Sequence, residues 1–189
     1  MNLIHRYVCR SAQWKKTVET LIFPWVLNKV DLGENVLEVG PGPGVTTDLL
    51  RTRVPRLTCV EVDPALAGSL ARRMEGQNVT VLCQDATAMP FANRTFDSAV
   101  SFTMLHHVPS ALLQDKLLAE VVRVLRPGGV FAGVDSRYST RFRMLHFFDT
   151  MVVVDPETFP KRLAAAGFSG IDVESNARAF RFRATVKAS

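Results

Sequence analysis

A short apolar strand that runs directly into three alternating glycines constrains this chain more than any other feature. Residues 36–39, apolar except for Glu38, are followed by glycine at every second position: Gly40, Gly42 and Gly44. Glycine at such a turn allows positive φ and a close approach of the backbone to a neighbour, both of which a Cβ would hinder. A helical pattern follows, and its first N–H groups would point toward the same place. The segment therefore predicts a strand–turn–helix unit that binds a nucleotide-like ligand.

The spacing of these glycines and the acidic residue before them narrow the range of possible ligands. Dinucleotide-binding loops carry G-x-G-x-x-G, whereas this chain has E-x-G-x-G-x-G from Glu38 to Gly44. The sequence contains no G-x-x-x-x-G-K-[ST] phosphate loop. The carboxylate of Glu38 would repel a pyrophosphate and would suit a ligand with an amino or sulfonium group. The pattern thus argues against a nicotinamide oxidoreductase and against a nucleoside triphosphate site.

Short apolar segments alternate with helical patterns along the chain, which predicts an α/β fold. The spacing predicts strands over residues 35–39, 57–62, 79–83, 98–102, 130–134, 171–174 and 180–186, and helices over residues 11–30, 46–52, 64–74, 110–125 and 156–166. This order favours a mostly parallel sheet with helices on both faces. We expect one domain over residues 1–189, with an N-terminal helical segment (1–33) and a cofactor-binding and catalytic core (34–189).

Composition and charge limit the partners and the compartment. Hydrophobic residues make up 47% of the chain, as in a globular domain, and no apolar run is long enough to span a bilayer. The net charge of +5 comes from scattered basic clusters, so nucleic acid is a poor candidate partner. The N-terminus is a poor signal peptide, which favours the cytoplasm. The three cysteines lack metal-ligand spacing, so we predict no metal site, and Cys59 and Cys83 are expected to be buried thiols.

The ends of the second and third predicted strands carry acidic residues. In an open α/β sheet, ligands bind at the carboxyl ends of the strands. A carboxylate at Glu61, followed by Val62, can accept both hydroxyls of a ribose. Asp85 can accept from the exocyclic amine of a base, while the N–H of Ala86 donates to a ring nitrogen. Asp63 precedes a proline and is instead predicted to be an N-cap.

The fourth predicted strand ends at Ser101 and Phe102, and two adjacent histidines follow. His106 and His107 therefore lie where a substrate would meet a ligand bound at the other strand ends. Histidine titrates near neutral pH and can act as a base. The alternative is that one histidine packs beneath a short helix as a hydrogen-bonded core residue while the other faces solvent.

In this order, the motifs resemble the class I S-adenosylmethionine-dependent methyltransferases over about residues 34–174. They occupy residues 36–44, 59–64, 84–86, 89–91, 95–107 and 123–129. The resemblance implies a single Rossmann-like doubly wound domain whose seven-stranded sheet is mostly parallel with the last strand antiparallel. It also implies S-adenosyl-L-methionine as the cofactor and S-adenosyl-L-homocysteine as the product.

The resemblance further implies which residues hold the cofactor. Glu38 and the glycine loop would face its methionine part, Glu61 its ribose, and Asp85 with Ala86 its adenine. The full predicted cofactor set is Glu38, Gly40, Pro41, Gly42, Gly44, Glu61, Val62, Asp85, Ala86, Ser101 and Phe102. Methyl transfer is an in-line displacement, so the protein mainly aligns the reactants and excludes water. A hydroxyl acceptor needs a base, for which His106 and then His107 are the candidates.

Residues 141–151 fall where related enzymes cover the acceptor. This segment contains apolar and aromatic side chains, which favour a small lipophilic or aromatic acceptor: Phe142, Leu145, Phe147 and Phe148. The methylated atom is expected to be oxygen or nitrogen. They could equally form an ordinary amphipathic helix, and His146 is expected to be structural or exposed. The N-terminal segment leaves little chain for a cap, so the acceptor site is expected to be open or completed by a second subunit of a homodimer.

Two other functions stay open. Residues 37–44 and 60–63 also resemble the ribosomal RNA adenine dimethylases, and the basic charge agrees. Those enzymes carry N-L-P-[YF] after the fourth strand, where this chain has residues 101–104, Ser-Phe-Thr-Met, and little chain remains for their RNA-binding domain. A flipped base needs a stacking and edge-reading pocket that this stretch does not supply. The other alternative is a protein that binds S-adenosylmethionine without catalysis.

Overall fold

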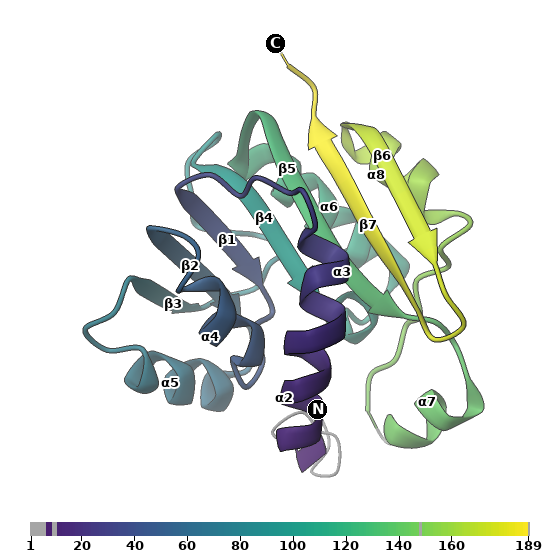
Figure 1. Ribbon diagram of the computed structural model, residues 1–189. Helices are drawn as coiled ribbons and strands as arrows, with labels where there is room; N and C mark the ends of the chain where they lie inside the picture. The colour runs from purple at the N-terminus through teal and green to yellow at the C-terminus, as the bar shows by residue number, and fades with distance from the viewer. Residues whose placement is uncertain (1–6, 9–10, 148, 189) are drawn as a thin grey trace.

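A seven-stranded sheet forms the centre of the molecule (Figure 1). The computed structural model describes residues 7–8, 11–147 and 149–188. The strand order is β3-β2-β1-β4-β5-β7-β6, with β1 to β5 paired in parallel and β7 antiparallel to both β5 and β6. The strands are β1 Asn35–Val39, β2 Arg56–Glu61, β3 Val79–Cys83, β4 Phe96–Phe102, β5 Leu125–Ser136, β6 Phe168–Ser175 and β7 Ala179–Val186. The predicted Rossmann-like sheet with its last strand antiparallel is confirmed.

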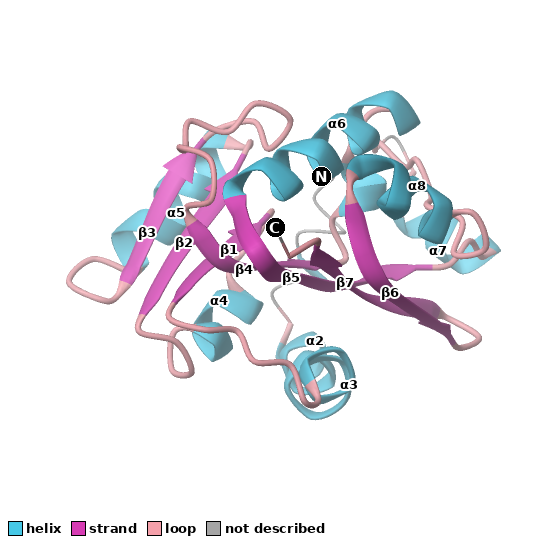
Figure 2. Ribbon diagram, turned by 90° about the horizontal axis from the view of Figure 1, so that it is seen from above, coloured by secondary structure: helices cyan, strands magenta, loops and turns pink. Residues whose placement is uncertain are grey.

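Helices cover both faces of this sheet (Figure 2). Helices α6 and α8 lie on one face, while α2, α3 and α4 lie on the other. The helical elements are α2 Ala12–Thr17, η1 Val18–Ile22, α3 Phe23–Leu27, α4 Val45–Leu50, α5 Pro64–Arg73, η2 Leu105–His107, α6 Ala111–Val124, α7 Thr140–Leu145 and α8 Phe159–Ala166. In the described residues, no helix combines the length and the apolarity that crossing a membrane requires.

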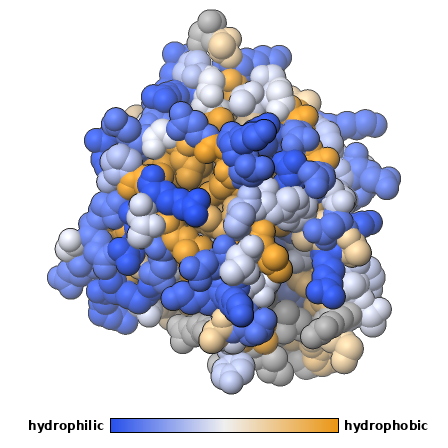
Figure 3. Space-filling view, viewed as in Figure 1, coloured by the Kyte–Doolittle hydropathy of each residue, from blue (hydrophilic) through white to orange (hydrophobic). Residues whose placement is uncertain are grey.

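Each face of the sheet carries its own apolar core, because successive side chains of a strand point to opposite faces. Leu37 of β1 packs with Leu117 of α6 and with other residues of that face. Its neighbour Val36 belongs to the second core, with Phe23 of α3 and Leu70 of α5. Burial on both faces explains why the central strands are almost continuously apolar. On the outside, Figure 3 shows an apolar area in the middle of the face seen in Figure 1, surrounded by polar side chains.

The N-terminal segment forms one helical run across Pro24. Proline lacks an N–H, and its ring crowds the carbonyl four residues earlier, so it normally kinks or ends a helix. Here η1, a π-helical turn, ends just before Pro24, and the N–H of Phe23 donates to the carbonyl of Val18 five residues back. This wider turn accommodates the ring. The predicted helix over residues 11–30 therefore appears as α2, η1 and α3.

Several local predictions can be compared with the structure. Asp63 is the N-cap of α5, as predicted, because its Oδ1 accepts the N–H groups of the second and third residues that follow it. Cys59 is buried as predicted, but the prediction for Cys83 was wrong, because β3 is an edge strand and leaves Cys83 exposed. Cys9 lies outside the described residues.

Candidate functional site

A cavity of about 350 Å³ opens where the first four strands end. Its wall includes residues 40–43 after β1, Glu61 and Val62 at the end of β2, Asp85 and Ala86 after β3, and residues 102–104 at the end of β4. The order β3-β2-β1-β4 places the β2 and β3 residues on one side of the glycine loop and the β4 residues on the other. The cavity thus lies at the carboxyl edge of the sheet, where α/β proteins bind their ligands.

The glycine loop takes the conformation that its sequence demands. Gly40, Gly42 and Gly44 have φ values of +66°, +55° and +85°. The N–H of Gly40 donates to the carbonyl of Val60 at 2.9 Å, and a Cβ on Gly40 would overlap the side chain of Met104. These constraints fix the turn and keep the backbone at the wall of the cavity.

Gly44 serves packing rather than the cavity, outside whose described wall it lies. It is the N-cap of α4, and a Cβ on it would overlap Leu70 and Arg73 of α5. Gly44 was predicted to contact the cofactor. In the structure it lies beside α5, away from the cavity wall.

Glu38 lies beneath the loop and not in the cavity wall. Its side chain is buried, and its carboxylate accepts the hydroxyl of Thr46 and that of Thr47, the latter at 2.6 Å. The thiol of Cys59 lies 3.4 Å away. Burial raises the pKa of Glu38 above its ordinary value. Glu38 therefore fastens the first turn of α4 to the end of β1. The two threonines that follow Gly44 and Val45 were the sequence signal for this role, and sequence reasoning missed it.

Glu61 both faces the cavity and holds the loop. Its Oε2 accepts the N–H of Gly42 at 2.9 Å, and its Oε1 accepts the N–H of Asp63 at 3.0 Å. Burial raises the pKa of this carboxyl. Each carboxylate oxygen has two lone pairs, so each can accept a further hydrogen bond from a ligand. Beside it, the side chain of Val62 is 68% exposed and offers an apolar surface at the cavity wall.

The residues after β3 and at the end of β4 differ in how they meet the cavity. Asp85 is exposed, and its Oδ1 accepts the N–H of Thr87 at 2.8 Å, which leaves the other oxygen available to a ligand. Phe102 lines the cavity and stacks on Phe23 with ring centroids 5.7 Å apart. Ser101 was also predicted to contact the cofactor, but it is fully buried and is not among the residues that line the cavity. Alternation along β4 explains this, because it turns Ser101 and Phe102 to opposite faces.

The two predicted catalytic histidines have different surroundings. His106 is buried and outside the described cavity wall, whereas His107 is half-buried and lines the cavity. The Nδ1 of His106 lies 2.5 Å from Oδ1 of Asp135, and its backbone N–H donates to Oδ2 at 3.1 Å. The preference for His106 over His107 as the catalytic base therefore does not fit the geometry. Asp135 at the end of β5 was not among the predicted site residues.

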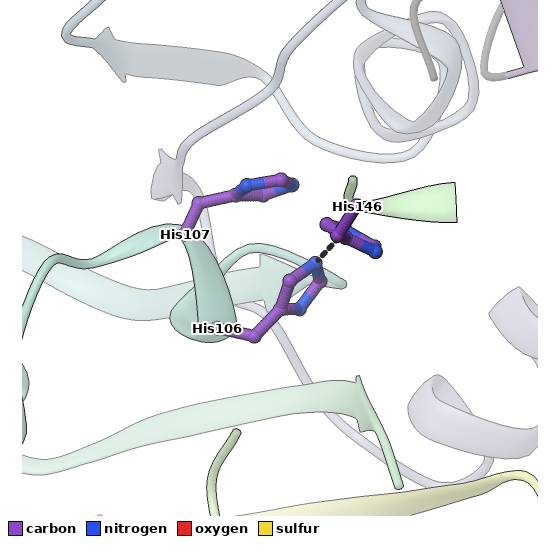
Figure 4. A group of neighbouring side chains, drawn as sticks. All are labelled: His106, His107 and His146. Carbon is purple, nitrogen blue, oxygen red and sulfur yellow. Dashed lines mark hydrogen bonds between the residues drawn. The ribbon is translucent and has the colours of Figure 1, made fainter. Parts of the chain in front are cut away.

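A third histidine joins this pair from a distant segment (Figure 4). His146 was expected to be structural or exposed, and it is buried, with its Nε2 3.1 Å from Nε2 of His106. Its Nδ1 lies 2.9 Å from the carbonyl oxygen of Phe142, one turn earlier in α7. Burial lowers the pKa of His146. The contact between His106 and His146 could not be predicted, because no local sequence pattern shows that the segment after β5 packs against η2.

The apolar wall of the cavity comes from unexpected places. Trp14, Val18 and Ile22 of the N-terminal helical run line it, together with Leu113 and Leu117 of α6. The expectation that the N-terminal segment contributes little to a cap was therefore wrong. The segment expected to supply this wall, residues 141–151, lines the cavity with Asp149 and Thr150, while its described apolar side chains lie outside the cavity wall. Phe142 packs on the ring of His106 with centroids 4.9 Å apart, and Phe147 is 67% exposed. Phe148 and the side chain of Leu145 lie outside the described part of the chain.

Comparison with known sequences identifies the family. Residues 37–133 match the family described as the methyltransferase domain. The chain belongs to this family. It is a class I S-adenosylmethionine-dependent methyltransferase, and S-adenosylmethionine is its cofactor. Membership of this family favours catalysis over the alternative of a protein that only binds the cofactor.

The described residues fit this cofactor. Glu61 offers spare lone pairs for a ribose diol, and Asp85 with the N–H of Ala86 can pair with an adenine edge. Val62 supplies an exposed apolar face beside them. Gly42 has φ of +55° and no atom within 4 Å of where its Cβ would stand, so the loop leaves room at the cavity wall. These hydrogen-bonding groups therefore suit a nucleoside.

The relatives share the methyltransferase chemistry but differ in acceptor. The chain is 31% identical over 151 residues to ribosomal RNA small subunit methyltransferase A of Bordetella pertussis, covering 70% of this chain and 56% of that protein. It is 31% identical over 116 residues to sterol 4-C-methyltransferase strm-1 of Caenorhabditis elegans, covering 58% of this chain and 34% of the relative. The chain thus spans about half or less of the length of these curated relatives.

Solved structures show the same fold. N-methyltransferase NodS from Bradyrhizobium japonicum superposes with a TM-score of 0.70 at 20% identity, covering 94% of this chain and 98% of NodS. The protein solved in complex with the Trm112 methyltransferase activator of Haloferax volcanii superposes with a TM-score of 0.75 at 14% identity, covering 97% of each chain.

Proposed function

We propose that this methyltransferase acts on an oxygen or nitrogen atom of a small apolar or aromatic acceptor. The observation that carries the proposal is the division of the cavity wall. Glu61 and Asp85 lie on the β2–β3 side of the glycine loop, while His107 follows β4 on the other side. Apolar side chains of α2, η1 and α6 also line the wall, together with Asp149 and Thr150. The polar side suits the cofactor and the apolar remainder suits the acceptor.

The cofactor side works through hydrogen bonds that are ready before binding. S-adenosylmethionine, when bound, supplies an activated methyl group on a positively charged sulfur. In the proposal Glu61 accepts the ribose hydroxyls, while Asp85 and the N–H of Ala86 hold the adenine. Glu61 is already fixed by two backbone N–H groups, so little side-chain freedom is lost on binding. Glu38 acts indirectly, because its carboxylate holds the helix turn that follows the loop.

The acceptor side orients the nucleophile and excludes water. Trp14, Val18 and Leu117 provide an apolar surface there. His107 is the histidine placed to meet the acceptor, and it would take a proton from a hydroxyl, whereas an amine needs little help. His106 would act as a positioning residue, because its ring lies against that of His107 with centroids 4.2 Å apart.

Labelled methyl transfer tests the acceptor class. The purified chain is incubated with methyl-labelled S-adenosylmethionine and either an extract of small metabolites or stripped ribosomal RNA. We expect label in an organic-extractable product and none in RNA. A His107→Ala variant that transfers label at the wild-type rate would remove His107 from the reaction.

Ribosomal RNA is the second candidate acceptor, and the similarity to ribosomal RNA small subunit methyltransferase A favours it. Against it, residues 103 and 104 are Thr and Met, where adenine dimethylases carry a proline and an aromatic residue. Label in RNA and none in the metabolite fraction would favour this candidate over a small acceptor. A second subunit is not part of the proposal, since the same chain supplies Trp14, Val18 and Ile22 to the wall.

A further inference from the structure

Two buried imidazoles face each other through their Nε2 atoms. His106 and His146 are 1% and 3% exposed, and their Nε2 atoms are 3.1 Å apart. They come from η2 and from the residue that ends α7, far apart in the chain. A contact this short is favourable only if one of the two nitrogens carries a proton or if a cation lies between them.

The hydrogen-bond partners decide where the ring protons are. The carbonyl oxygen of Phe142 can only accept, so the Nδ1 of His146 carries a proton. Asp135 accepts the N–H of Ser136 at Oδ1 and that of His106 at Oδ2, as a carboxylate does. The Nδ1 of His106 therefore also carries its proton toward Asp135. In both neutral rings, Nε2 is then the unprotonated nitrogen, and the two Nε2 lone pairs point at each other.

A third imidazole lies at the same point. His107 packs against His106 and His146, with ring centroids 4.2 Å and 5.2 Å apart (Figure 4). One ring nitrogen from each of the three histidines falls within 4.8 Å of the others. We propose that His106, His107 and His146 bind one divalent transition-metal ion of the zinc type.

The surroundings match those of a three-histidine metal site. Zinc binds imidazole nitrogen at about 2.0–2.1 Å, which sets nitrogen–nitrogen distances of about 3.3 Å in a tetrahedral site. The 3.1 Å pair is already close to this value, and half-buried His107 closes the third position by rotating its side chain. Asp135 and the carbonyl of Phe142 hold the outer nitrogens of the other two ligands, as carboxylates and carbonyls do around bound metals.

The fourth coordination position has a use in this enzyme. His107 lines the cavity, so an ion held by the three histidines would lie at its edge. An oxygen acceptor bound there would lose its proton more readily, because a metal ion lowers the pKa of a bound hydroxyl. This role rests on the proposed methyl transfer to a small acceptor, whereas metal binding itself does not. The prediction of no metal site from cysteine spacing would then be wrong.

Cobalt titration tests the site without any methyl transfer. The full chain is treated with a chelator, dialysed and titrated with Co²⁺ while its visible absorption is recorded, and Zn²⁺ is then added as a competitor. We expect one Co²⁺ per chain, an intense tetrahedral band and its loss when Zn²⁺ displaces the cobalt. Asp135→Asn should weaken the affinity by about 10–100-fold, the effect typical of losing the group behind a ligand.

Matched variants separate this site from adventitious binding. His146→Ala and His107→Ala should each abolish the band, and His107→Ala at its half-buried position covers the case in which His146→Ala does not fold. His5→Ala changes the fourth histidine of the chain, which lies outside the described residues, and should leave the titration unchanged. Absence of the band, or a band that survives both substitutions, would overturn the proposal and leave a shared proton between His106 and His146. Calorimetry of S-adenosylmethionine with the metal-free chain tests the methyltransferase proposal independently.

Discussion

The carboxylate of Glu61 accepts the backbone N–H of Gly42 at 2.9 Å, so the residue that we propose binds the ribose also fixes the loop beside it. Two strands that are adjacent in the sheet, β1 and β2, are thereby tied together at the edge where the cavity opens. A change at Glu61 affects ligand binding through a lost contact and through a looser loop.

Glu61→Ala should weaken the binding of S-adenosylmethionine by about 1.5–3 kcal/mol, because hydrogen bonds to a charged group are lost. Isothermal titration calorimetry of both proteins measures the difference. Glu34→Ala is the control, since the side chain of Glu34 is 75% exposed at the other end of the sheet. Equal affinities for wild type and Glu61→Ala would contradict the assignment.

Gly42→Ala and Gly76→Ala form a matched pair. Both glycines have positive φ, and an added Cβ would meet nothing within 4 Å at either position. Each substitution should cost about 1–2 kcal/mol of unfolding free energy, the cost of a left-handed backbone with a Cβ. Only Gly42 lines the cavity, so only Gly42→Ala should lower the affinity for S-adenosylmethionine, by about tenfold or more. A similar loss in Gly76→Ala would show that the effect comes from strain alone.

Glu38 should make the protein less stable as the pH rises. Burial raises its pKa in the folded state, so the native protein holds this proton more tightly than the unfolded chain does. Between the ordinary pKa of glutamate and the raised value, the unfolded state binds fewer protons, and the free energy of unfolding therefore falls with pH. Urea unfolding from about pH 4 to about pH 7 measures this slope in wild type and Glu38→Gln. The variant should gain stability relative to wild type as the pH increases, and a difference that does not change with pH would contradict this role of Glu38.

His106→Ala should destabilise the metal-free protein more than His107→Ala. Removing His106 leaves the fully buried carboxylate of Asp135 without its imidazole partner, a loss of about 2–3 kcal/mol for a hydrogen bond to a charge. His107 is half-buried, and its removal leaves that pair intact. Thermal or urea unfolding in the presence of a chelator compares the two. A larger loss in His107→Ala would mean that the pair of His106 and Asp135 contributes little to stability.

The strands and the loop could be predicted because their signals are local. The apolar residues of β1 and the glycines after it lie within ten residues, and Asp63 caps a helix that begins at the next residue. The role of Asp63 was therefore predictable from two adjacent residues. Even so, β5 begins at Leu125, several residues before the predicted start, because Leu125 already pairs with Phe96 of β4. The Pro-Gly-Gly sequence forms an irregularity in this pairing, with Gly128 at a φ of +76°.

The contacts that depend on distant residues could not be predicted. Cys83 lies in the same kind of apolar run as Cys59, but only the order of the strands tells which of the two is at an edge. His146 meets His106 only because the segment after β5 folds back over η2, and no spacing rule links two residues so far apart. Trp14 belongs to the helix predicted over residues 11–30, but its place in the cavity wall depends on where the N-terminal run docks.

The position of β7 has a consequence for how the chain is made. β7 lies between β5 and β6 although it follows β6 in the sequence, and within the described sheet β6 pairs with β7 alone. During translation, β6 leaves the ribosome before its hydrogen-bonding partner has been synthesised. Until Ala179–Val186 emerge, Phe168 and the other apolar residues of β6 are open to neighbouring nascent chains and to chaperones. Chaperone binding to the nascent chain should therefore be strongest after β6 has emerged and before β7 has inserted between β5 and β6.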